Sequence, residues 1–315
     1  MRDQKGPLVI PKTGLGLPMQ IPGPVHLNVV PKKSEPINIV DQKLVTDMII
    51  HDSKRKVPNA EGIMNRVVYD CLEAPHGTKK EDQESEESPL YITKKDGHIM
   101  LKPYYTPKNS ADNTLVFESR FESGNLRRAI QVYEYEYDLI LKFDINTRGH
   151  TQWFYFSVSN VRKNVRYKFN IINLLKPDSL YNSGMKPLVY SEADARTKGR
   201  GWYRDGSRIC YYQNGIKRKG GSFYTFTYSM KFQNQNDTYY FAYCYPYTYT
   251  NLQNYLHNLE QDPVRRKLFR RRSLCQTLAG NTCDLLTITS FSGDPQTLKK
   301  RKGVVVSARV HPGES

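Results

Sequence analysis

The chain has 315 residues, too many for one ordinary compact domain and too few for three, so its length predicts two domains. Hydrophobic residues make up 38% and aromatic residues 12%, which is enough for a core and excludes a wholly disordered protein. The mean hydropathy is -0.66, and no apolar run approaches the roughly 18 residues of a membrane span. No apolar stretch follows the basic amino terminus, so we expect no secretory signal, no membrane partner and a cytoplasmic protein.

Positive charge is the strongest compositional signal: 47 Lys and Arg residues oppose 31 Asp and Glu residues, for a net charge of +16. Residues 162–231 contain 15 Lys or Arg against four Asp or Glu, and residues 260–315 contain 11 against five. The excess therefore lies beyond residue 161. A solvated basic surface is one interpretation, and a binding surface for an acidic polypeptide or for nucleic acid is the other.

The cysteines point to a reduced protein. There are five of them, an odd number, and the sequence contains no Cys-x-x-Cys pair. This spacing argues against a disulfide framework and against a thiolate zinc site. We expect these cysteines to be reduced and mostly structural.

The first 110 residues predict little regular structure. Seven prolines fall within residues 6–36, which is typical of an extended, polyproline-like segment. Residues 81–88 form an acidic run that we interpret as a solvated loop or linker, with an internal mimic of an acidic ligand as the alternative. Residues 1–110 are therefore predicted to be Pro-rich and acidic, and largely disordered or irregular.

The middle of the chain alternates apolar and polar residues in the manner of strands. The pattern covers residues 115–121, 129–143, 151–158, 166–173, 208–213, 223–232 and 238–245, with turn residues between them. Tyrosine is frequent throughout, as is usual in half-buried strands. Residues 111–245 are therefore predicted to form an antiparallel β-sandwich or barrel.

After residue 245 the pattern changes. Leucines at helical spacing predict a helix over residues 250–260, with Thr250 as its cap and Asp262-Pro263 as its stop. Residues 273–278 and 283–290 predict a hairpin joined through Gly280-Asn281, and a linker over residues 292–302 follows. Residues 303–310 are rich in valine and predict a strand buried on both faces. Residues 246–315 are thus predicted to be the incomplete start of an α/β domain.

The last five residues carry the sharpest candidate site. His311 and Glu314 follow directly on the predicted buried strand, where ligand-binding residues collect in open α/β sheets. An imidazole nitrogen and a carboxylate at this spacing can face the same metal ion. The His-x-x-Glu spacing also arises by chance, so its context decides its meaning.

The context resembles a known family. Residues 307–315, Ser-Ala-Arg-Val-His-Pro-Gly-Glu-Ser, resemble the first zinc-ligand motif of the zinc carboxypeptidases, and of their cytosolic branch in particular. Residues 117–126, 150–156 and 245–250 look like the β-rich amino-terminal domain of the cytosolic carboxypeptidases and its junction with the catalytic domain. The resemblance runs from about residue 114 to the last residue.

The resemblance implies a mainly β protein, in which an antiparallel β-sandwich precedes the truncated start of an α/β zinc-carboxypeptidase domain. It also implies a metallopeptidase that removes glutamates from acidic protein tails, tubulin foremost, with His311 and Glu314 as zinc ligands. The family's third zinc ligand and its general base lie further along than residue 315. We therefore expect residues 1–315 to be an inactive fragment or short isoform that holds well below one zinc ion per molecule.

Two other functions compete with this interpretation. A non-catalytic module could hold acidic tails or microtubules without cleaving them. Nucleic-acid binding is the lesser alternative, carried by the basic runs at residues 265–272 and 299–302, although no finger, helix-turn-helix or RNA-binding signature accompanies them. Outside these runs, His150 is predicted to be a turn residue and Trp153 to belong to the sandwich rather than to a base-stacking platform.

Overall fold

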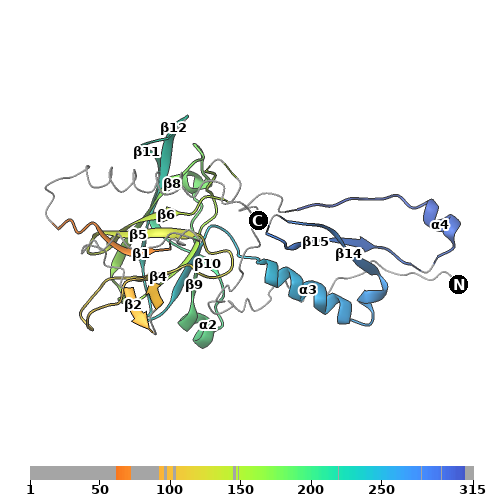
Figure 1. Cartoon of the computed structure of the whole chain (residues 1–315), viewed down its shortest axis with the longest axis horizontal. Helices are drawn as coiled ribbons and strands as arrows, with labels where there is room; N and C mark the ends of the chain where they lie inside the picture. Colours follow the sequence, from red (N-terminus) through yellow and green to blue (C-terminus); the bar gives the residue numbers. More distant parts are fainter. Residues whose placement is uncertain are drawn as a thin grey trace.

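The computed structural model describes residues 62–71, 92–95, 98–101, 104–144, 147, 149–218, 220–277, 279–291 and 293–308. The predicted Pro-rich segment 6–36 and the acidic run 81–88 lie outside these residues. The described chain forms a β-sandwich from which an arm projects (Figure 1). The arm contains α3, β14, β15 and α4.

The larger sheet has six strands in the spatial order β1–β5–β6–β8–β12–β11. Their bounds are β1 (Arg66–Asp70), β5 (Leu126–Tyr133), β6 (Glu136–Leu141), β8 (Arg166–Leu174), β12 (Gly221–Lys231) and β11 (Ser207–Arg218). Neighbouring strands are antiparallel except β6 and β8, which run parallel. The chain leaves this sheet after β6, passes through the smaller sheet and returns as β8, and a parallel pair requires such a crossover.

The smaller sheet has five strands in the order β10–β9–β13–β7–β4, all antiparallel. Their bounds are β10 (Tyr203–Arg204), β9 (Leu188–Ser191), β13 (Tyr239–Ala242), β7 (Tyr155–Ser159) and β4 (Val116–Glu118). A separate hairpin pairs β2 (Ile92–Lys95) with β3 (His98–Leu101). The short helices η1 (Leu180–Ser183) and α2 (Glu192–Lys198) flank β9 in the chain.

The two sheets pack face to face around aromatic side chains. The rings of Phe169 on β8 and Phe241 on β13 have centroids 5.5 Å apart, and those of Tyr137 on β6 and Phe117 on β4 are 5.2 Å apart. All four side chains are fully buried. Both pairs are tilted, at 47° and 56°, and because such aromatic pairs combine large buried area with favourable ring geometry, this layer stabilises the packing of the two sheets. The predicted mainly β sandwich is confirmed, with the single parallel pair β6–β8 as an exception to its antiparallel character.

One predicted strand is wrong in its extent. Residues 129–143 alternate without interruption, yet the structure divides them between β5 and β6 at a tight turn over Glu134 and Tyr135. Tyr133 pairs with Glu136 across this turn. A two-residue turn alone would invert the period-two pattern, but a register shift between Gln131 and Tyr133 adds one residue. Ala129 and Leu139 therefore face each other with both side chains in the core, and most odd-numbered residues of the two strands stay buried.

The sandwich also begins earlier than the boundary at residue 111 that the sequence predicts. β1 pairs with β5 along the edge of the six-stranded sheet, and Val68, Tyr69 and Tyr105 are buried in the core. β1 is only five residues long and Arg-Val-Val-Tyr-Asp shows little alternation, so the sequence pattern does not reveal it. The division of the whole chain into domains remains a prediction.

The arm begins with α3 (Tyr249–Gln261), which contains the predicted helix 250–260. Its cap is Thr248 rather than the predicted Thr250, and Asp262 ends it as expected. The helical turn η2 (Arg265–Lys267) leads into the hairpin of β14 (Phe269–Gln276) and β15 (Thr282–Ile288), which confirms the predicted hairpin, and α4 (Pro295–Lys299) follows.

The strand predicted over residues 303–310 does not form in its described part. Residues 303–308 are extended and unpaired, and Val304, Val305 and Val306 are 85%, 96% and 86% exposed. A strand requires a neighbour for its backbone hydrogen bonds, and no described strand pairs with this segment. The valine-rich pattern therefore favours a strand, but the described residues contain no partner strand for it.

Candidate functional site

The predicted zinc ligands His311 and Glu314 lie outside the described residues. Their role as ligands therefore stays a prediction. Within the described ranges no three His, Cys, Asp or Glu side chains come together in a way that could hold a metal ion. In the same ranges no helix is long and apolar enough to cross a membrane. The arm directly precedes these two residues in the chain.

The arm is tied to the sandwich at the first turn of α3. The hydroxyl of Thr248 accepts a hydrogen bond from the backbone N–H of Asn251, and the carboxylate of Glu122 accepts one from the backbone N–H of Thr250 at 2.9 Å. Glu122 belongs to the sandwich, in the loop after β4. Because a helix amino terminus carries partial positive charge, this carboxylate both caps α3 and anchors it.

Four polar residues, which we call the arm polar cluster, join α3 to the hairpin: Gln253, Glu260, Arg271 and Asp284. Arg271 Nε donates to Asp284 Oδ1 at 2.7 Å and Nη1 donates to Glu260 at 3.3 Å. Gln253 donates to Asp284 Oδ2 at 2.8 Å and accepts from Arg271. Burial raises the pKa of Asp284, but the hydrogen bonds and charge of its partners outweigh it, so this pKa lies below its ordinary value.

A second group on the arm is basic and exposed. We call Arg265, Arg266, Lys267, Arg270 and Arg272 the arm basic cluster. The first three form η2, while Arg270 and Arg272 lie on β14, which begins earlier than the predicted strand 273–278. In a strand successive side chains point to opposite faces, which directs Arg271 to α3 and its two neighbours away from it.

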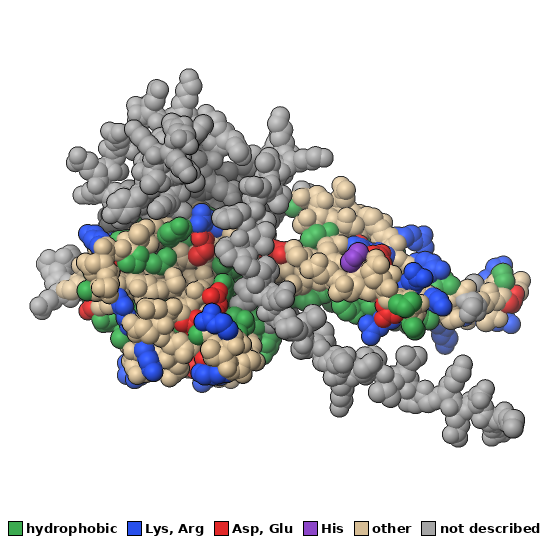
Figure 2. Space-filling view, turned by 90° about the horizontal axis from the view of Figure 1, so that it is seen from below, with side chains coloured by type: hydrophobic (Ala, Val, Ile, Leu, Met, Phe, Trp, Pro, Cys, Tyr) green, Lys and Arg blue, Asp and Glu red, His purple; other side chains and the backbone are tan. Residues whose placement is uncertain are grey.

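The arm basic cluster has few carboxylates near it. Arg265 pairs with Asp262 at 3.4 Å, and Arg270 lies over the ring of Phe291 at 4.3 Å. Figure 2 shows Lys and Arg side chains gathered along the arm. Residues 299–302 add four further exposed basic side chains, and Arg301 hydrogen-bonds the chain at residues 289 and 290 immediately after β15.

Basic side chains of the sandwich are more often engaged in the fold. Lys168 pairs with Glu136 at 2.8 Å, and Arg166 donates to Ser207 at 3.0 Å. Arg162 binds the backbone carbonyls of residues 110 and 112 and the side chain of Asn113. Several basic side chains of residues 162–231 are thus bound within the sandwich. Among the described residues, the basic side chains of the arm are therefore more available to a binding partner.

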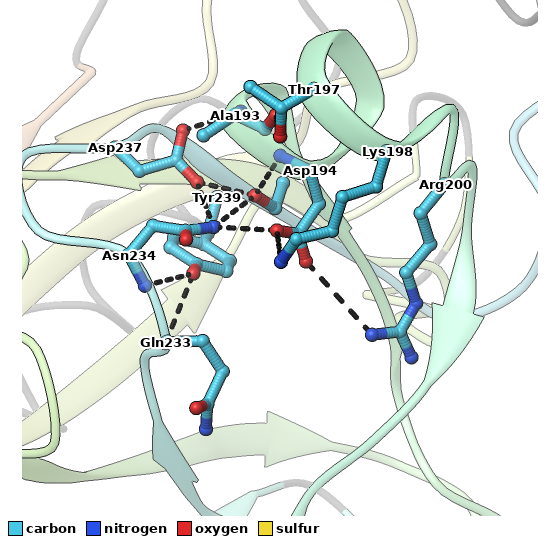
Figure 3. A network of polar contacts seen from close by, with 10 residues as sticks. Ala193, Asp194, Thr197, Lys198, Arg200, Gln233, Asn234, Asp237 and Tyr239 are labelled. Carbon is cyan, nitrogen blue, oxygen red and sulfur yellow. Dashed lines mark hydrogen bonds and ion pairs between the residues drawn. The ribbon is translucent and has the colours of Figure 1, made fainter.

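The densest polar network of the sandwich is also structural (Figure 3). Asp194 accepts from Lys198 at 2.7 Å and from Asn234 at 2.9 Å, while Asp237 accepts from Ser191 at 2.5 Å. Both carboxylates are buried. The hydrogen bond from Lys198, the hydrogen bond from Asn234 and the charge of Lys198 lower the pKa of Asp194. Because these groups cap α2 and fasten it to the loop before β13, the network stabilises the fold and leaves no carboxylate free for acid–base chemistry.

The other two residues considered from the sequence, His150 and Trp153, have structural roles in their immediate surroundings. His150 is exposed, and its backbone accepts from Asp144 and donates to Thr147, so it is a turn residue as predicted. Trp153 donates from its ring nitrogen to the carbonyl of Ser123 at 2.7 Å and packs beside buried aromatics on the outer face of the smaller sheet. The prediction that Trp153 is structural is confirmed.

A shallow hollow of about 420 Å³ lies beside Arg66 on β1. The guanidinium donates to Tyr105, Thr114 and Gln131, at 3.3, 2.5 and 2.6 Å. Tyr105 in turn donates to Asp112 at 2.7 Å. These bonds fix the segment 104–114 against the sheet, so the hollow is framed by a structural clamp rather than by free reactive groups.

Comparison with known proteins agrees with this architecture. Residues 117–244 match the family model described as the cytosolic carboxypeptidase N-terminal domain. The chain is 52% identical over 210 residues to cytosolic carboxypeptidase 2 of Homo sapiens, covering 67% of this chain and 23% of that protein. It is 50% identical over 209 residues to cytosolic carboxypeptidase 3 of Mus musculus, covering 66% and 21%.

Among solved structures, a metallo-carboxypeptidase from Burkholderia cenocepacia matches with a TM-score of 0.41 and 20% identity, over 56% of this chain and 40% of that one. The family-model match relates the sandwich to the amino-terminal domain of cytosolic carboxypeptidases. Over about two-thirds of its length the chain is about half identical to cytosolic carboxypeptidases 2 and 3. It spans about a quarter or less of the length of these relatives.

Proposed function

We propose that this chain is part of a zinc metallocarboxypeptidase of the cytosolic type, which removes glutamates from acidic protein tails such as those of tubulin. The observation that carries the proposal is the identity of about half over 210 residues with cytosolic carboxypeptidase 2. Residues 1–315 contribute to this activity in two ways, through zinc ligands and through a basic surface.

His311 and Glu314 are the proposed zinc ligands. An imidazole nitrogen and a carboxylate oxygen suit zinc, and three protein ligands with one open position are the usual catalytic arrangement. When bound, the metal supplies Lewis-acid polarisation of the scissile carbonyl and a water of lowered pKa. Two ligands hold zinc weakly, so we expect residues 1–315 by themselves to bind well below one zinc ion per molecule and to release no glutamate.

The zinc proposal is tested by measuring zinc bound to the chain at rising free zinc, beside the variants His311→Ala and Glu314→Ala. We expect weak binding that each substitution lowers. Tight stoichiometric zinc, or binding indifferent to both substitutions, would contradict the assignment. Glutamate release from peptides ending in glutamate, by a polypeptide that also contains the third ligand and the general base, should be lost with His311→Ala.

The arm basic cluster is the proposed recognition surface for acidic tails. Its five side chains are exposed, and among the described residues Asp262 is the one carboxylate that forms an ion pair with them. A cluster of one sign attracts oppositely charged polypeptides from a distance and orients them. This is also the observation that favours the second candidate function, a module that holds acidic tails without cleaving them.

Binding of a labelled glutamate-rich peptide tests whether the arm basic cluster recognises acidic tails specifically or only through its net charge. We compare Arg265→Gln/Arg266→Gln/Lys267→Gln with Lys163→Gln/Lys176→Gln/Lys186→Gln, which removes the same charge from exposed sandwich residues. The arm variant should weaken binding about tenfold and the control variant less than about twofold. Equal losses would reject the arm as the recognition surface. Tighter binding of duplex DNA or RNA than of the peptide at equal salt would favour the nucleic-acid alternative.

A further inference from the structure

Two of the five cysteines, Cys275 on β14 and Cys283 on β15, face each other across the arm hairpin. They are Cα partners in the antiparallel register, both are exposed, and their thiols hydrogen-bond to one another. Directly opposed residues of an antiparallel pair have Cα atoms roughly 4.5 to 5.5 Å apart, which lies within the range that disulfides span. The described strand registers oppose no other two cysteines; Cys210, for example, lies opposite Thr227.

A β-bulge brings the two cysteines into opposition. The register is regular as far as Ser273, which faces Asp284, and it shifts by one residue before Cys275. Leu274 is the extra residue of this bulge. In an unbulged ladder Leu274 would face Cys283, so the alignment of the thiols depends on the bulge and not only on their spacing in the chain.

We propose that Cys275 and Cys283 are a redox-active pair that closes to a disulfide in the presence of glutathione disulfide and reopens with excess glutathione. The thiolate of one cysteine attacks glutathione disulfide and releases one glutathione thiolate. The second cysteine then attacks the mixed disulfide and releases the second. Two S–H bonds are lost and one S–S bond forms in the protein, while glutathione disulfide is reduced to two glutathione molecules that take up the two protons.

The electrostatics of the pair suit this order of events. The charge of a Cys275 thiolate is the largest cause that raises the pKa of Cys283, and burial and the hydrogen bond to Cys275 add to it. Cys283 therefore loses its proton less readily than an isolated thiol, because a second negative charge beside it is unfavourable. Exposure of both side chains gives a glutathione-sized oxidant access to either sulfur.

The bond would join the two strands beside the bulge, one residue from Asp284 of the arm polar cluster. A cross-link at this point restricts opening of the hairpin. The pair lies in the described hairpin and involves neither His311 nor Glu314, so this inference stands whether or not the chain is part of a deglutamylating enzyme.

The test uses the reduced chain of 315 residues, equilibrated in glutathione buffers, acid-quenched, alkylated and digested with trypsin. Both cysteines lie in residues 273–299, which contain Lys or Arg only at the last position and follow Arg272, so one tryptic peptide reports on both. We expect this peptide without alkyl groups and about 2 Da lighter than the dithiol form. The effective concentration of one thiol towards the other, obtained from the equilibrium with glutathione, should be at least about tenfold higher in native protein than in concentrated urea.

Three variants complete the experiment. Cys210→Ser removes an exposed cysteine elsewhere and should leave the result unchanged, whereas Cys283→Ser should leave only a mixed disulfide of glutathione at Cys275. Deletion of Leu274 places Cys275 directly after Ser273, in the position that faces Cys283 in an unbulged ladder, so it should keep the cross-link and leave the effective concentration near its native value. Equal effective concentrations in native and unfolded wild-type protein, or separate glutathione adducts on both cysteines without a cross-link, would overturn the proposal.

Discussion

Arg271 on β14 binds Asp284 on β15 through a hydrogen bond of 2.7 Å between Nε and Oδ1, beneath α3. The side chains are 21% and 6% exposed, so this ion pair is largely shielded from water. It helps to fasten the hairpin to the helix, because the same guanidinium and carboxylate also bind Gln253 on α3. The arm therefore owes its geometry to a polar contact as much as to apolar packing.

Removal of Arg271 should loosen the arm. Arg271→Ala leaves the carboxylate of Asp284 without its cation, at a local cost of about 2 kcal/mol. Amide hydrogen exchange in β14 and β15 should accelerate by about thirtyfold, which is the same energy expressed as a rate ratio. Arg272→Ala is the matched control, since Arg272 is an exposed neighbour directed away from α3, and it should leave exchange unchanged. Equal acceleration in both variants would show that the ion pair does not hold the hairpin.

Stability should fall in acid through carboxylates with lowered pKa. Asp194 and Asp284 have folded-state pKa values below the ordinary value of 3.8. A depressed pKa contributes stability that is complete above about pH 4 and is lost as the pH falls through the folded-state pKa. Urea midpoints at pH 7 and at pH 3 measure the effect. Asp194→Asn should flatten this pH dependence, whereas substitution of the exposed Asp178 by Asn should not.

Two core tyrosines should respond in opposite directions to loss of the hydroxyl. Tyr228 is fully buried, and its hydroxyl has no hydrogen-bond partner within the described part of the chain, so Tyr228→Phe should stabilise the protein by about 1 kcal/mol. Tyr137 is equally buried but its hydroxyl accepts from the backbone N–H of Leu115 at 2.9 Å. Tyr137→Phe should therefore destabilise by about 1 kcal/mol. Urea denaturation decides, and a loss of stability in both variants would contradict the assignment for Tyr228.

A methyl group at Gly124 should not be accommodated. A Cβ at this position would lie 2.2 Å from the carbonyl oxygen of Ser119, whose hydroxyl binds the backbone of both Tyr155 and Leu126. The substitution Gly124→Ala should cost about 3 kcal/mol by overpacking. Gly303→Ala is the control, because no atom lies within 4 Å of a Cβ there. Unchanged thermal and urea unfolding of Gly124→Ala would show that this loop is free to shift.

Local patterns predicted several elements well, and tertiary pairing explains where they did not. Apolar spacing placed α3 to within one residue at each end, because an amphipathic face is written directly in the sequence. The same reasoning merged β5 with β6, since the register shift between Gln131 and Tyr133 offsets the two-residue turn and keeps the alternation in phase. It also missed the exposed pair of cysteines, whose opposition depends on a bulge at Leu274 that no composition signal marks.

The sequence by itself determined the strand-rich character of residues 115–245, the arm helix and hairpin, and the resemblance that relates the chain to the cytosolic carboxypeptidases. These features depend on periodicity and on the order of residues, which are local properties. Only the tertiary structure decided which basic side chains are bound within the fold and which are exposed. Arg162 donates hydrogen bonds to backbone carbonyls of the sandwich, whereas Arg266 is exposed on the arm. Net charge counts every cation equally, but an ion's availability depends on the atoms that the fold places beside it.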